Sequence, residues 1–167
     1  FVALVAQIRF ALELGIEWLI TGRVRYQGTQ DVRGGDQVRL DVWAAEALLR
    51  LNRGTEAESA AGRALRLFRR AQHDTETASC LGVLGGVALQ EGRPGRAATL
   101  FRDAQRREAA AGNPSGAALH GVGVAQAEIQ RGRARAGAAV AKRSAAVFGS
   151  RKLASRQARA LAVAAEG

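Results

Sequence analysis

The sequence contains few of the residues on which many folds and sites depend. Its 167 residues include no Met, one Cys, two His, two Pro and, among aromatic residues, two Trp, one Tyr and five Phe. A β-sandwich or β-barrel is disfavoured, because pleated sheets are built largely from β-branched and aromatic side chains. The absence of Met leads us to expect that these residues are a segment of a longer protein.

Small residues and good helix formers make up most of the chain. It has 36 Ala and 20 Gly, and much of the remainder is Leu, Val and Arg. Ala, Leu and Arg rank near the top of the helix-propensity scale. The composition therefore predicts an all-α protein with more than roughly 70% helix, and the length suits one domain with its own core.

The lone cysteine and the most apolar segment bear on location. Cys80 cannot form an internal disulfide, which favours a reducing compartment, and we expect the cytoplasm.

Residues 1–20 are the most apolar stretch, but Arg9, Glu13 and Glu17 follow one another at four-residue steps. Three charges on one helical stripe are costly inside a bilayer. We therefore expect no membrane partner, and a helix that docks on a neighbouring helix.

Turn-forming residues recur at regular intervals. Clusters that combine turn formers with a helix N-cap residue lie at 34–36, 72–74, 112–114 and 149–150, with nearly equal spacing. Shorter breaks fall midway between them. Each unit is therefore predicted to be two helices of about four to five turns joined by a short turn. The expected N-caps are Asp36, Asp74, Asn113 and Ser150, and Pro94 is expected in the first turn of its helix.

When the sequence is shifted against itself by 40 residues, about one such unit, small residues align with small residues. Ala57, Ala97 and Gly137 coincide, as do Ala64, Ala104 and Ser144. Two helices cross closely only where their contact points lack bulk, so a hairpin that repeats its small positions repeats its packing. A fixed period of this length predicts an α-solenoid of antiparallel helical hairpins.

One unit of the array resembles a known repeat. Its sequence Leu81-x-x-Leu84-Gly85-x-x-Ala88, followed by Ala97-x-x-x-Phe101-x-x-Ala104, is similar to the tetratricopeptide repeat. The period of 40 exceeds the about 34 residues of that family. Such longer repeats resemble those of large bacterial signal-responsive transcription regulators.

The resemblance implies an organisation for the whole chain. It predicts a repeat domain over residues 36–167, with about three repeats at 36–73, 74–112 and 113–149 and a capping helix at 150–166. Residues 1–35 are expected to be an N-terminal helix and a linker of unknown role.

The resemblance also implies a binding surface. In tetratricopeptide arrays the first helix of each repeat lines a concave groove that receives a peptide or a partner helix, so we expect a protein or peptide partner. Alternatively, residues 1–20 or a neighbouring domain cover these faces. Some members of the family hold the C-terminal carboxylate of a peptide with Lys and Asn side chains. Such a clamp is not expected here, because the first Lys in the sequence is Lys142. The matching inward positions are Arg39, Val42, Glu46, Leu49, Ser79, Gly82, Gly86, Leu89, Leu119, Val122, Gln126 and Ile129.

Catalytic and metal-binding residues are hard to find. His73 falls in a turn, and His120 shares its repeat position with Cys80, which indicates packing rather than a metal site. The Gly-rich stretches at 82–86 and 121–124 lack the rest of a phosphate-binding loop, and close helix packing explains them better. We therefore expect no enzyme activity, no cofactor and no metal.

Positive charge offers a second interpretation. The net charge is +10, and residues 113–167 hold nine basic residues against two acidic ones. This pattern suggests sequence-nonspecific nucleic-acid binding as the alternative function. Phe148 is the only aromatic residue in that span, so bases have little to stack on and we expect only weak, salt-labile binding. The basic residues are Arg131, Arg133, Arg135, Lys142, Arg143, Arg151, Lys152, Arg156 and Arg159.

Overall fold

The structure, a computed structural model, describes residues 34–167, and this part of the chain is helical with no strand. The predicted all-α solenoid is confirmed. The helix and linker expected over residues 1–35 lie outside the described part, except that Gly34 and Gly35 open the first described helix. The helices are α2 (Gly34–Arg50), α3 (Gly54–Arg70), α4 (Asp74–Gln90), α5 (Pro94–Ala110), α6 (Pro114–Gln130), α7 (Ala134–Ser150) and α8 (Ala154–Ala165).

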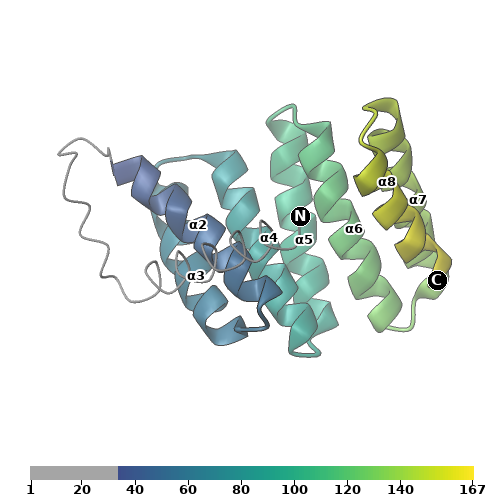
Figure 1. The fold of residues 1–167 in the computed structure, drawn as a ribbon, viewed down its shortest axis with the longest axis horizontal. Helices are drawn as coiled ribbons and strands as arrows, with labels where there is room; N and C mark the ends of the chain where they lie inside the picture. Colours follow the sequence, from purple (N-terminus) through teal and green to yellow (C-terminus); the bar gives the residue numbers. More distant parts are fainter. Residues whose placement is uncertain (1–33) are drawn as a thin grey trace, which may run out of the picture.

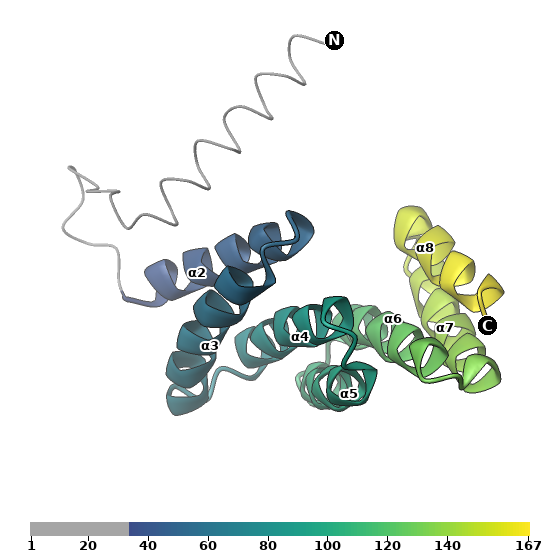
Figure 2. The ribbon, with the colours of Figure 1, turned by 90° about the horizontal axis from the view of Figure 1, so that it is seen from below.

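The helices stack into an arch (Figures 1 and 2). Helices α2, α4, α6 and α8 form an inner row in which each helix contacts the next. Helices α3, α5 and α7 form an outer row, and no Cα atom of one of these three comes within 8 Å of a Cα atom of another. Figure 2 shows that the open side of the arch carries the inner row. None of the helices between residues 34 and 167 has the length and apolarity needed to cross a membrane.

A three-residue turn with one shared geometry joins each described helix to the next. Its middle residue has a positive φ, between 54° and 75° in the six turns. The residue that follows donates its backbone N–H to a carbonyl near the end of the preceding helix, as Arg53 does to Leu48 at 2.9 Å. This bond defines a Schellman motif, whose left-handed residue is usually Gly. The middle residues are Asn52, Gln72, Gly92, Gly112, Gly132 and Lys152.

These turns, more than side-chain caps, set the helix boundaries. Asn113 is the predicted N-cap of α6, and its side chain accepts a 3.0 Å hydrogen bond from the Gly116 N–H. Pro94 begins α5, as predicted. The other three N-cap predictions are wrong, since Asp36 and Asp74 are already helical and Ser150 ends α7. The backbone turn fixes where each helix starts, and the turn residues before α3, α4, α5, α7 and α8 make no side-chain cap bond.

Small residues carry the contacts between helices. Ala57, Ala64, Ala97 and Ala104 have no exposed surface, as their shared repeat positions predicted. Phe101 of α5 lies between glycines of two inner helices. A Cβ on Gly85 would come within 2.9 Å of its ring, and a Cβ on Gly123 within 2.6 Å. Close packing therefore accounts for these helical glycines.

The turn geometry makes a stability prediction. Gln72 holds a left-handed conformation that costs a non-Gly residue about 1 kcal/mol, and glycine adopts it without that penalty. We expect Gln72→Gly to raise the free energy of unfolding by about 1 kcal/mol in urea denaturation. The matched variant Gly92→Gln should lower it by a similar amount. A destabilised Gln72→Gly protein would contradict the role given to this turn.

Candidate functional site

Every residue of the predicted groove lies in a helix of the inner row. Their side chains differ in how much of their surface is exposed to solvent. Leu119 is 41% exposed, while Glu46, Ser79 and Gln126 are half-buried. These four side chains come from α2, α4 and α6, and they are partly open to solvent. Arg39 lies in α2, and its side chain is outside the described part.

Other predicted groove residues take part in packing. Val42 and Val122 are buried. Leu49, Leu89 and Ile129 are half-buried and pack against buried clusters. Their faces therefore contribute mainly to the core, with limited surface left for a ligand.

The two predicted groove glycines receive side chains from neighbouring helices. A Cβ on Gly86 would lie 2.4 Å from Leu49 Cδ2, and a Cβ on Gly82 would lie 2.6 Å from His120 Cε1. The sequence placed these glycines in the groove lining and also attributed the stretch 82–86 to close helix packing. The packing dominates: Leu49 of α2 and the ring of His120 of α6 occupy the space above α4, because each inner helix packs closely on the next.

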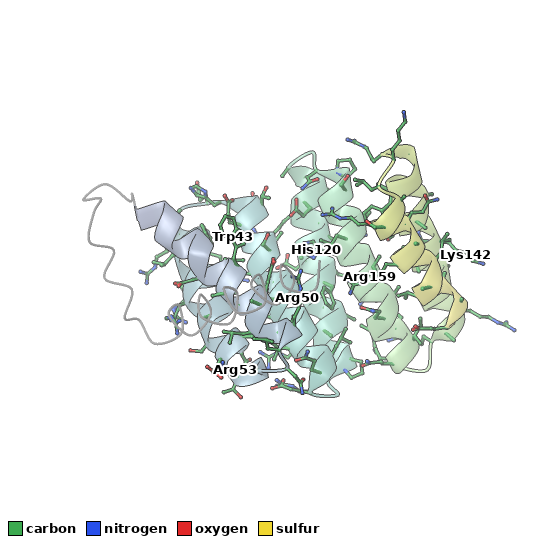
Figure 3. The ribbon with its side chains drawn as sticks, in the orientation of Figure 1. Trp43, Arg50, Arg53, His120, Lys142 and Arg159 are labelled. Carbon is green, nitrogen blue, oxygen red and sulfur yellow. The ribbon has the colours of Figure 1, made fainter. Side chains whose placement is uncertain are left out.

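Two features of the inner row were not predicted. The Gln90 side-chain amide donates a 2.8 Å hydrogen bond to the Leu49 carbonyl, and this bond ties α4 to the end of α2. Trp43 is 63% exposed on α2, where Figure 3 labels it. Val83 and Val163 share its repeat position, and both are buried against the hairpin that precedes them. The repeat register places Trp43 at a position that a preceding hairpin covers in the later repeats, and the described array begins with α2.

A buried polar cluster connects the inner and outer rows. The Asn113 side-chain amide donates a 2.8 Å hydrogen bond to Glu108 Oε2, and His120 Nε2 lies 3.9 Å from Glu108 Oε1. Burial lowers the pKa of His120 from 6.5 to about 4. Burial raises the pKa of the Glu108 carboxyl, and the bond from Asn113 opposes that rise. Asn113 and Glu108 fix the turn between α5 and α6, and burial keeps the His120 ring neutral where it packs against Gly82.

Cys80 occupies the same repeat position in α4 and is also enclosed. Burial raises the pKa of its thiol to about 12, so it stays protonated and unreactive near neutral pH. Between residues 34 and 167 no three His, Cys, Asp or Glu side chains gather as a metal site would require.

The basic residues of the last third are spread over both rows. Arg131 and Arg133 lie in the turn between α6 and α7, and both pair with the buried carboxylate of Glu128, at 3.3 and 2.8 Å. Lys142 belongs to the outer helix α7, whereas Arg159 belongs to the inner helix α8 (Figure 3). Lys142 and Arg159 therefore belong to different rows of the arch.

The fold defined by these hairpins is a tetratricopeptide-like helical solenoid. A solved structure described as the crystal structure of Rap protein complexed with competence and sporulation factor matches it with a TM-score of 0.72 at 13% sequence identity. The match covers 98% of this chain and 52% of that one, so the chain spans about half the length of that protein. No protein-family profile and no curated protein matches the chain.

The buried cluster predicts a pH dependence of stability. An unfolded His120 binds a proton near pH 6.5 and the folded one only near pH 4, so its contribution is present above pH 6.5 and is lost as the pH falls towards 4. Between pH 7 and about pH 4.5 that loss is on the order of 2 to 3 kcal/mol. Glu108 acts oppositely, since its raised pKa favours the folded state at lower pH.

The variant His120→Leu removes the contribution of the histidine to the pH dependence of stability and leaves the contribution of Glu108. We expect its free energy of unfolding to fall less than that of the parent over this pH range, measured by urea denaturation. Parallel pH profiles for the two proteins would show that His120 does not titrate as described.

Proposed function

We propose that this chain is a scaffold that binds a peptide or a protein segment on the inner row of the arch. The observation that carries the proposal is the partly open, mostly uncharged centre of that row. Leu119 offers an apolar contact there, and Ser79 and Gln126 offer a hydroxyl and an amide. Short side chains with hydrogen-bonding groups suit an extended peptide or a single helix.

Charge at the ends of the inner row would orient such a partner. Arg50 and Glu46 belong to α2 at one end, and Arg159 belongs to α8 at the other; Figure 3 labels both arginines. The Rap protein of similar fold is described in complex with competence and sporulation factor, and this supports a partner of the same general kind. Charges at the rim of an interface favour one orientation over another more than they add affinity.

We place this activity in a larger regulatory protein of a bacterial cell. The long repeat resembles those of signal-responsive transcription regulators, and a binding module of this kind reports a partner to the rest of the chain. A cytoplasmic location suits the single buried thiol of Cys80. The module acts by binding, and no enzyme activity is assigned to it.

A peptide selection tests this proposal. A display library of random peptides is selected on the parent protein, and enriched peptides are then measured against Leu119→Asp. We expect a class of peptides whose affinity falls by about tenfold or more, because the variant places a charge at the apolar contact of the inner row.

The matched control is Leu67→Asp on the outer helix α3. Leu67 is 47% exposed, so the two leucines are similarly accessible, and neither substitution should change the melting temperature by more than a few degrees. The proposal fails if no enriched peptide distinguishes the two variants.

A further inference from the structure

The outer row has a groove of its own between α5 and α7. Its volume is about 980 Å³, and α6 forms its floor. The groove exists because the backbones of neighbouring outer helices stay apart. Its walls include residues between 99 and 109 of α5, and residues between 133 and 147 of α7 and the turn before it. At a rise of about 1.5 Å per residue these stretches are about 15 and 21 Å long, so the groove suits an elongated ligand of three to four helical turns.

Comparison of the repeats explains why the groove is open at this place. In the matching gap between α3 and α5, Arg96 of α5 reaches across to Glu58 of α3, with 3.0 Å between the charged atoms. One repeat further on, the equivalent positions are Ala136 and Ala98. The bridge between outer helices is therefore missing between α5 and α7.

Other side chains on α7 are also shorter than their counterparts on α5. Val140 stands where α5 has Leu100, and Val147 stands where α5 has Arg107. Val140 and Val147 are half-buried and pack against the core, and their remaining surface lines the groove. These replacements widen the groove and give it an apolar wall.

The rim of the groove is positively charged. Arg143 lines it and makes no ion pair or hydrogen bond with any residue in the described range 34–167. Arg106, on the opposite wall, is 79% exposed and has a single 3.4 Å contact with Asp103. Glu128 in the floor is already neutralised by Arg102 and Arg133, so it does not offset the two rim arginines.

We propose that this outer groove binds an acidic amphipathic helix of a partner protein. The apolar stripe of that helix would lie on Val140 and Val147, and its Asp or Glu side chains would pair with Arg106 and Arg143. An amphipathic helix in an apolar groove is a common mode of recognition, and the charges of rim and ligand are complementary. The assignment is independent of the inner row, which faces the other side of the arch.

The lining argues against nucleic acid as the occupant. No aromatic residue lines the groove, so bases would have nothing to stack on. Its valine wall would meet a phosphate backbone without any compensating interaction. An acidic peptide, by contrast, uses the apolar wall and the arginines together.

The same peptide library, measured against groove variants, tests the assignment. We expect a class of enriched peptides with net negative charge and apolar residues at helical spacing. Their affinity should fall by about tenfold or more in Arg143→Glu and in Ala136→Glu, which place a repelling carboxylate in the groove. It should be unchanged in Leu119→Asp, which separates this class from peptides of the inner row.

Two controls match these variants on the same helix. Lys142→Glu makes the same change of charge one residue away, and Ala139→Glu adds a carboxylate at another exposed alanine of α7; neither residue lines the groove. The inference is overturned if the controls weaken binding as much as the groove variants, or if no acidic peptide is sensitive to Arg143→Glu. It is also overturned if labelled duplex DNA, and no peptide, depends on Arg143.

Discussion

The close approach of one inner helix to the next is the constraint on which the whole structure depends. It requires that side chains be absent at the crossing points, and the chain meets the requirement with glycine and alanine. Gly86 receives Leu49 and Gly82 receives His120, both from neighbouring inner helices. Because the backbones of the inner helices come close to one another and those of the outer helices stay further apart, the stack bends. The inner face and the outer groove both follow from this unequal spacing.

Glycine within a helix lowers helix stability by about 1 kcal/mol relative to alanine. In this protein the loss is offset by the side chains that fill each glycine position. Phe101 shows the principle most clearly, since one ring occupies the space left by Gly85 and by Gly123. Helix propensity alone would place alanine at both positions, and a Cβ there would overlap the ring.

The sequence predicted the repeat well because the packing between helices recurs with every hairpin. Ala97 and Ala104 could be assigned to the core from their register alone. Helix starts were harder to predict, because Gln72 and Lys152 adopt the turn conformation that composition assigns to Gly or Asn. The sequence located the turn at 72–74, but it did not show that Gln72 holds the left-handed conformation there.

The candidate site was predicted only in part, for a related reason. Periodicity identifies the face of a helix, but it does not show which neighbour fills a vacant position. Leu49 and His120 fill the positions above Gly86 and Gly82, and the sequence did not show which side chains would do so. The outer groove could not be predicted from the sequence. It depends on differences between equivalent positions, such as Arg96 and Ala136, and on where the fold places them.

The uniform spacing of helices and turns restricts how such a chain can change its length. The helices from α2 to α7 are equally long and are joined by turns of equal length, so inner and outer helices alternate at a constant interval. Loss or gain of one hairpin preserves the remaining interfaces, because contacts run only between near neighbours. Loss or gain of a single helix with its turn would instead bring an outer helix, rich in Arg, into the inner row. Natural insertions and deletions in such chains are therefore expected in units of a hairpin.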